Sequence, residues 1–203
     1  MLKINFNEKY QLFYLKKALN EMVDEKENNI IKNINIDHHN GCNYINNIQV
    51  PLTFPIYILD YTNKLDKNKE LDYNFFGTIT NKRNWIKKYN KHNSIIKHSN
   101  YGRDNKTKYE IDKDYYNIMC KSKFTLTPTG DCPWSYRFFE AIMCLSIPVL
   151  EDNSNDVYMK DYFYFFDKDD HIYDIDKAIS NYNNFINSKH FLKNIKDVVF
   201  ANT

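Results

Sequence analysis

The chain has 203 residues, of which 42% are hydrophobic and 16% aromatic; this is enough to bury a core and excludes a disordered composition. Its 28 basic and 26 acidic residues give a formal net charge of +2, which argues against nucleic acid as a partner. No apolar run approaches the ~20 residues that a membrane span needs, and the first residues lack the apolar segment of a signal peptide. We therefore expect a soluble, cytoplasmic protein.

The four cysteines carry no metal-binding pattern. Cys42, Cys120, Cys132 and Cys144 form no Cys-x-x-Cys pair, and no histidine lies at a zinc-finger offset from them. We expect free thiols in a reducing compartment.

The first part of the chain predicts little regular sheet. Apolar residues at helical spacing, such as Leu12, Leu15 and Leu19, predict a helix over residues 8–32. Residues 37–47 are polar and predict a loop, and two prolines in residues 48–59 predict an extended, broken segment. Residues 62–70 are charged and rich in asparagine, so we place a domain boundary between residues 70 and 71.

From residue 71 onward, strand and helix patterns alternate. Strands are predicted at 71–76, 94–97, 124–127, 147–150 and 162–166. Helices are predicted at 83–89, 112–120, 135–145, 175–186 and 190–199, with a loop at 101–107 and a turn at 129–134. This alternation predicts an α/β domain over residues 71–203, with a Rossmann-like, mostly parallel sheet and flanking helices. Ligands of such sheets bind beyond the carboxyl ends of the strands, where the turns at Gly77 and Thr129 begin.

Residues 121–153 hold the pattern with the most chemistry. Gly130 permits a tight turn and close approach of a ligand to the backbone. Asp131 or Ser135 can cap the helix that follows, and the free N–H groups at its amino end favour a phosphate. Arg137 lies in the first turns of that helix, and its planar guanidinium suits a diphosphate.

Glu140 follows Arg137 by three residues and therefore lies on the same helix face. A carboxylate there can accept two hydrogen bonds from a vicinal diol such as a ribose. The alternative is an Arg–Glu pair on an exposed helix face, worth only ~0.2–0.5 kcal/mol.

The order and spacing of these residues resemble the exostosin-type glycosyltransferases. The matching elements are Ser122-Lys-Phe, Pro128-x-Gly-Asp, Pro133-Trp-Ser, Arg137, Phe139-Glu-Ala-Ile and Ile147-Pro-Val. Upstream, Phe75-Phe-Gly followed by Arg83 is similar to the opening of that family's donor domain, and Ile48-Gln-Val-Pro is faintly similar to the segment before it. The sequence departs from the family at Leu145 and Ser146, where the family usually has Gly and Cys, so the packing of helix against strand should differ there.

The resemblance implies a two-lobed fold of the GT-B kind, in which residues 71–203 form the donor-binding C-terminal lobe. It implies a hexosyltransferase-like enzyme that needs neither metal nor cofactor, with a nucleotide-diphosphate sugar as donor and a glycan or other hydroxyl as acceptor. Arg137 would hold the diphosphate and Glu140 the ribose. Gly77, Arg83, Gly130, Asp131 and Ser135 would line the same site.

The 70 residues before this domain are too few for a complete acceptor lobe, and we expect an N-terminal extension or a reduced remnant of that lobe. The base of an inverting enzyme would come from there, and no catalytic residue is assigned. Three interpretations remain open: a minimal enzyme, a non-catalytic module that binds nucleotide sugar, and a chain whose partner subunit supplies the acceptor lobe.

Other patterns admit simpler interpretations. Asp112-Lys-Asp and Asp174-Ile-Asp could bind a metal, but both stand at predicted helix starts, where aspartate is favoured. His38 and His39 are expected in a solvated loop, and Tyr115 and Tyr116 in the packed interior. Glu151 and Asp152 follow a strand and could touch a ligand or only form a polar loop. An unrelated Rossmann-like enzyme is disfavoured, because the chain has no Gly-x-Gly-x-x-Gly motif and no phosphate-loop lysine.

Overall fold

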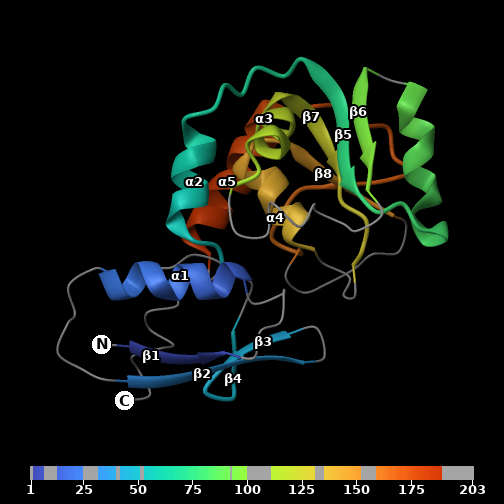
Figure 1. Cartoon of the computed structure of the whole chain (residues 1–203). Coiled ribbons are helices and arrows are strands. Elements are labelled where there is room, and N and C mark those ends of the chain that lie inside the picture. The colour runs from blue at the N-terminus through green and yellow to red at the C-terminus, as the bar shows by residue number, and fades with distance from the viewer. Residues whose placement is uncertain are drawn as a thin grey trace. The chain divides into compact units, whose positions relative to one another are not determined.

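The structure is a computed structural model of the whole chain (Figure 1). It describes residues 2–6, 13–24, 32–39, 42–50, 53–91, 93–99, 111–130, 135–151 and 159–188. The chain divides into two compact units, Tyr61–Phe185 and a second unit made of Met1–Asp60 with Ile186–Thr203. The boundary between Asp60 and Tyr61 lies inside a helix, whereas the boundary predicted after residue 70 lies at the start of a strand.

The N-terminal unit contains a four-stranded mixed sheet. Its elements are β1 (Leu2–Phe6), α1 (Phe13–Asp24), β2 (Lys32–His39), β3 (Cys42–Ile45), β4 (Ile48–Val50) and the start of α2 (Ile56–Asn63). The strand order is β1-β2-β3-β4, with β1 parallel to β2 and the other pairs antiparallel. The helix α1 buries Leu15, Ala18 and Leu19 completely.

The predictions for this unit are partly confirmed. The helix predicted over residues 8–32 is present at Phe13–Asp24, whereas Lys32 already belongs to β2. The loop predicted over residues 37–47 is wrong, because this range contains the end of β2, all of β3 and a hairpin turn. Asn46 and Asn47 form that turn with φ of 49° and 67°, and asparagine tolerates this left-handed conformation better than most residues.

The extended, broken segment predicted over residues 48–59 is confirmed at Ile48–Val50, which form the edge strand β4, and is wrong from Ile56 onward. The helix α2 begins at Ile56, directly after Pro55. Its first N–H groups are satisfied by Glu21, whose carboxylate accepts hydrogen bonds from the amides of Ile56 (2.7 Å) and Tyr57 (3.1 Å). Burial, and then the charge of Glu21, raise the pKa of Tyr57 to about 12.

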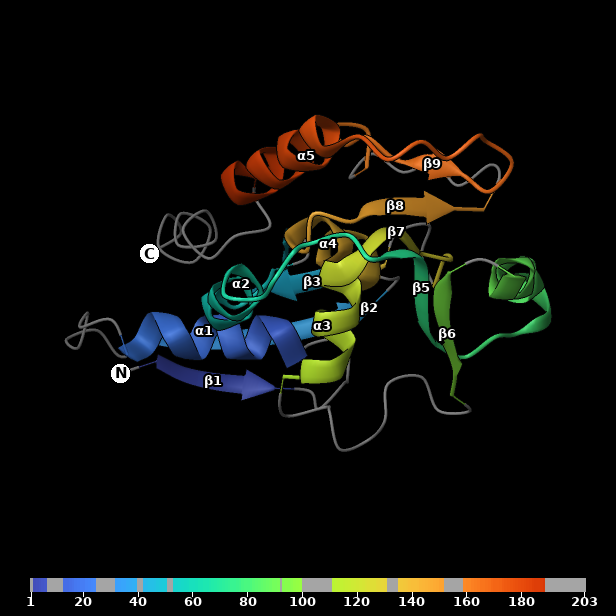
Figure 2. The same ribbon diagram turned by 90° about the horizontal axis from the view of Figure 1, so that it is seen from above.

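The unit Tyr61–Phe185 contains a five-stranded sheet in which every pair is parallel. Its strands are β5 (Leu71–Gly77), β6 (Ser94–His98), β7 (Ser122–Leu126), β8 (Ile147–Leu150) and β9 (Phe165–Phe166), in the order β6-β5-β7-β8-β9. Its helices are the 3-10 helix Asn81–Lys91, α3 (Lys113–Lys121), α4 (Tyr136–Met143) and α5 (Ile175–Asn187) (Figure 2). The predicted Rossmann-like α/β fold is confirmed.

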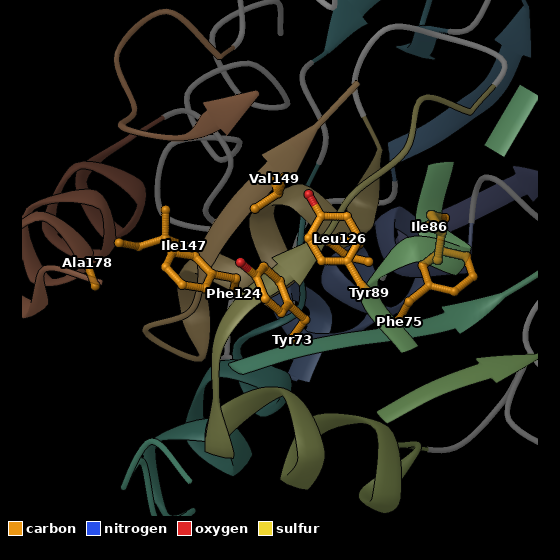
Figure 3. Packing of buried hydrophobic residues seen from close by; sticks show 9 residues of the cluster. All are labelled: Tyr73, Phe75, Ile86, Tyr89, Phe124, Leu126, Ile147, Val149 and Ala178. Carbon is orange, nitrogen blue, oxygen red and sulfur yellow. The ribbon is translucent and has the colours of Figure 1, made fainter. Parts of the chain in front are cut away.

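Alternate residues of the central strands build the core. Tyr73 and Phe75 of β5 lie on the same face as Phe124 and Leu126 of β7 (Figure 3). The 3-10 helix covers this face with Ile86 and its neighbour one turn on, Tyr89, and α5 adds Ala178; Ile147 and Val149 of β8 complete the cluster. The opposite face meets α3, where the ring of Phe76 packs edge-on against Tyr115 with centroids 5.7 Å apart.

Sequence patterns located most elements of this unit. The strand Ile147–Leu150 has the predicted bounds, and the other described strands and helices overlap their predictions. The strand predicted over 162–166 is reduced to Phe165–Phe166. The loop predicted at 101–107 and the helix predicted at 190–199 lie outside the described residues. Among the described residues, the helices are too short or too polar to cross a membrane.

Candidate functional site

The candidate site lies where the direction of the sheet connections reverses. After β5 the chain crosses to β6 on one side, and it then returns to form β7 on the other side of β5. Such a reversal between neighbouring parallel strands is a topological switch point, and ligands of open α/β sheets bind beyond the carboxyl ends of the strands there. The strands β5 and β7 end at Gly77 and Leu126.

The side chain of Arg137 reaches this switch point from α4. Its Nη2 donates a 2.6 Å hydrogen bond to the carbonyl oxygen of Phe76, the penultimate residue of β5. The guanidinium carbon lies 4.7 Å from the centre of the Phe75 ring, which is the geometry of a cation–π contact. Two contacts with β5 therefore fix a positive charge at the carboxyl end of the strand.

Gly77 makes room for that guanidinium. A Cβ atom placed on Gly77 would lie 2.9 Å from Nη2 of Arg137 and 3.3 Å from the Phe75 ring. Its φ of +153° is also a backbone conformation that side-chain-bearing residues rarely adopt. Both observations explain why the strand ends on glycine.

The amino end of α4 adds unsatisfied donors. Ser135 is the N-cap residue, with extended backbone angles, but its side chain makes no capping hydrogen bond. Among the described residues, neither Ser135 Oγ nor Arg137 Nε has a hydrogen-bond partner, although both atoms are buried. The predicted site residue Asp131 lies outside the described residues. Gly130 is exposed, and a Cβ placed on it would meet nothing within 4 Å.

Arg83 joins the two strand ends at the switch point. Its Nε and Nη2 donate to the carbonyl oxygen of Thr129 at 3.3 and 2.7 Å, after β7, and its Nη1 donates to Thr78 at 3.2 Å, after β5. Arg83 has non-helical angles (φ −104°, ψ 15°) and kinks the 3-10 helix there. The predicted site residue is thus held by backbone carbonyls of both loops.

Glu151 holds Thr129 from the other direction. Both carboxylate oxygens accept the Thr129 amide, at 3.1 and 3.0 Å, and Oε1 also accepts the Thr129 hydroxyl at 2.7 Å. All three polar groups of Thr129 are therefore engaged by two charged side chains. In the sequence, Glu151 stands out only as a residue after a strand, and Thr129 only as the start of a turn beyond a strand.

Glu140 lies in a different environment from Arg137. Its side chain is completely buried, and its two oxygens accept hydrogen bonds from the hydroxyls of Tyr115 (2.6 Å) and Tyr116 (2.9 Å) of α3. The alternative of an exposed Arg–Glu pair is wrong, because the carboxyl group has no exposed surface. The expectation that both tyrosines are interior residues is confirmed, since each is 1% exposed. A ribose could reach this carboxyl group only by replacing a tyrosine hydroxyl.

The other candidates have structural explanations. Asp112 caps α3 by accepting the Tyr115 amide at 3.0 Å, and Asp174 accepts the amides of Asp176 and Lys177 near the start of α5. His38 and His39 are the last two residues of β2 and do not lie in a loop. Asp152 falls outside the described residues. Within those residues, no three His, Cys, Asp or Glu side chains gather as a metal site would require.

The fold and site together define a doubly wound α/β protein with two arginines at its switch point. The family model of the Exostosin GT47 domain matches residues 77–161, a range that begins at Gly77 and contains Arg83, Ser135, Arg137 and Glu140. The resemblance to exostosin-like glycosyltransferases is confirmed over that range, which is less than half of the chain, and it supports the general class of glycosyltransferase. Searches of curated proteins and of solved structures gave no match.

Proposed function

We propose that the chain is a glycosyltransferase that binds a nucleotide-diphosphate sugar at the β5/β7 switch point and transfers the sugar to a hydroxyl of a glycan or another acceptor. The observation that carries the proposal is the position of Arg137. Its guanidinium is fixed at the carboxyl end of β5 by Phe76 and Phe75, and Arg137 itself lies in the first turn of α4. Cation and helix terminus thereby converge where open α/β sheets bind ligands.

The diphosphate is the part of the donor that this arrangement suits best. The positive end of the α4 dipole favours an anion, and Ser135 Oγ could donate to the same phosphate. When the sugar leaves the donor, negative charge accumulates on the diphosphate. A prearranged guanidinium and helix terminus would offset that charge without a metal ion, so we propose metal-independent, hexosyltransferase-like transfer.

The remaining predicted residues have different roles in this proposal. Gly77 allows Arg137 to approach β5, and Gly130 with Asp131 would lie beside the phosphate on the β7 side. Glu140 stays a predicted ribose ligand, subject to the exchange with tyrosine described above. The partner subunit, the cytoplasmic location and the role of residues 1–70 as a remnant acceptor lobe likewise stay predictions.

A second candidate is a module that binds nucleotide sugar without turnover. It is favoured by one observation: Glu151, a carboxylate that directly follows β8 at this edge of the sheet, accepts hydrogen bonds from Thr129 on both oxygens. A general base needs a lone pair within reach of the acceptor hydroxyl.

One experiment separates the two candidates and tests the proposal. The purified chain is incubated with a panel of radiolabelled nucleotide sugars, with and without oligosaccharide acceptors and with a chelator present. Release or transfer of the labelled sugar supports the transferase. Binding by calorimetry without release supports the module, and the absence of any binding contradicts both.

A further inference from the structure

Three segments at the carboxyl edge of the sheet meet at Thr129. Arg83 anchors its carbonyl oxygen from the segment after β5, and Glu151 anchors its amide and hydroxyl from the segment after β8. Thr129 itself follows β7. The loop that enters the proposed donor site is therefore fixed by its neighbours on both sides.

We propose that Glu151 is a positioning residue for the donor diphosphate, acting through Thr129 together with Arg83. The inference rests on the proposed function, because it assigns a role in the same site. Glu151 accepts three hydrogen bonds from one residue, and such charge-assisted bonds are roughly twice as strong as neutral ones. They fix the direction in which the chain leaves β7 toward Gly130 and the amino end of α4.

The carboxylate would otherwise oppose binding. A glutamate at an edge that binds diphosphate repels the ligand if its charge faces the site. Here both oxygens accept hydrogen bonds from the Thr129 amide and hydroxyl, and the Arg83 guanidinium binds the carbonyl oxygen of the same residue. Glu151 thus orders the turn while its carboxylate oxygens are directed at Thr129.

The geometry also explains why Arg83 differs from Arg137. Arg83 uses three of its N–H groups on the carbonyls of Thr78 and Thr129, so it ties the ends of β5 and β7 together across the switch point. Within the described part of the chain, Arg137 donates one hydrogen bond to the backbone, at Phe76, and its Nε has no partner. We assign positioning to Arg83 and direct phosphate contact to Arg137.

The test uses the full chain and two pairs of variants. Glu151→Ala removes the acceptor of the Thr129 amide and hydroxyl, with Glu70→Ala as control, because Glu70 is an exposed carboxylate paired with Lys121 before β5 begins. Thr129→Val removes only the hydroxyl donor, and Thr129→Ser restores it. Binding of UDP, GDP and ADP is measured by calorimetry, alongside the unfolding midpoint.

For the diphosphate bound by the wild type, we expect about tenfold weaker binding in Glu151→Ala and about threefold weaker binding in Thr129→Val, as expected for the loss of hydrogen bonds to a charged group. Thr129→Ser and Glu70→Ala should bind within about twofold of the wild type, a range typical of surface changes. Unchanged affinity in Glu151→Ala, or equal losses in Thr129→Ser and Thr129→Val, overturns the proposal.

A second measurement is independent of any ligand. Hydrogen exchange of the Thr129 amide, followed by NMR without nucleotide, should be about tenfold faster in Glu151→Ala than in wild type and unchanged in Glu70→Ala. If the wild type binds no diphosphate, the proposed function fails, and this exchange rate alone decides whether Glu151 orders the turn. An unaltered rate overturns that role as well.

Discussion

The guanidinium of Arg137 occupies the space that a side chain on Gly77 would need: a Cβ on Gly77 would stand 2.9 Å from Nη2. Gly77 ends β5 and Arg137 lies in the first turn of α4, so the pair joins the two halves of the proposed donor site. The absence of a side chain at Gly77 thereby determines where the charge of Arg137 lies.

Gly77→Ala should displace Arg137 from Phe76 and strain the backbone at φ +153°. We expect a loss of about 1–3 kcal/mol in the free energy of unfolding, since a residue with a Cβ is forced into a glycine conformation. Urea unfolding measures the loss. Gly130→Ala is the matched control, because its Cβ would meet nothing within 4 Å; equal losses in the two variants would contradict the steric account.

Leu145 ends α4 in a left-handed conformation, with φ of 54°, at the position where the resembling family usually has glycine. The carbonyl of Leu145 accepts the Tyr173 hydroxyl at 3.0 Å, and its side chain packs on the core. Leu145→Ala and Leu145→Gly both remove that packing, but only glycine relieves the backbone strain.

We therefore expect Leu145→Gly to be more stable than Leu145→Ala by about 1 kcal/mol, the reverse of the order at ordinary helical positions. Thermal unfolding of the two variants side by side measures the difference. A more stable alanine variant would show that the left-handed conformation imposes no strain at Leu145.

The buried carboxyl group of Glu140 connects α4 with Tyr115 and Tyr116 of α3. Glu140→Ala leaves two buried hydroxyls without this acceptor and should lower the free energy of unfolding by about 2–4 kcal/mol. Glu140→Gln keeps one acceptor oxygen and should lose about half as much. Denaturant titration of both variants, with the exposed Glu70→Ala as control, gives the comparison.

Nucleotide affinity of the same variants separates packing from ligand binding. If Glu140 also binds ribose, Glu140→Gln should weaken nucleosides and nucleoside diphosphates alike, whereas Tyr115→Phe should weaken neither by more than about twofold. Full affinity in a folded Glu140→Gln protein would remove Glu140 from the site and leave it a structural role.

Lys69 lies against the C-terminal ends of α3 and α4, where its Nζ donates to the carbonyls of Cys120 (2.6 Å) and Cys144 (2.8 Å). Burial lowers the pKa of Lys69 from 10.5 to about 8, against the opposing effect of the two thiols. Between about pH 8 and pH 10.5 the unfolded chain therefore binds more protons at this residue than the folded chain does.

The free energy of unfolding of the wild type, relative to Lys69→Met, should consequently rise across that pH range, by at most about 3 kcal/mol. The penalty for the buried charge is fully present below pH 8 and is relieved as the pH increases. Urea unfolding at pH 7 and pH 10, with thiols kept reduced, measures the change, and the same substitution at the exposed Lys64 is the control. A relative stability that falls with pH would contradict the burial of the ammonium.

The second unit could be predicted from sequence because its signals are local. The helix α3 has an aspartate cap and a buried face that includes Tyr115, Tyr116 and Met119, and β8 is a short apolar run that is buried throughout. Pattern and structure agree at such segments, since one face or both faces of each element are buried.

The N-terminal unit has weaker signals. Its strands carry polar residues such as Asn33, Asn35 and Asp37 at alternate positions, and such a polar sequence is also typical of a loop. The turn at Asn46 and Asn47 was the available clue, because two consecutive asparagines between isoleucines favour a two-residue hairpin. Pro55 was interpreted as a strand breaker, although proline is also common just at the start of a helix.

The site itself was only half predictable. The helix amino end, Ser135 and Arg137 follow from local spacing. Arg83 and Glu151 are 46 and 22 residues away from Thr129 in the sequence, and no local pattern predicts that these residues meet.

The most direct test of the account is the role of Arg137 in binding the diphosphate. Calorimetry compares Arg137→Ala with wild type for a nucleoside and for the corresponding nucleoside diphosphate. Loss of a charge-assisted contact predicts about 10- to 100-fold weaker binding of the diphosphate and no more than about a twofold change for the nucleoside. Equal losses for the two ligands, or an unchanged affinity for the diphosphate, would contradict the proposed donor site.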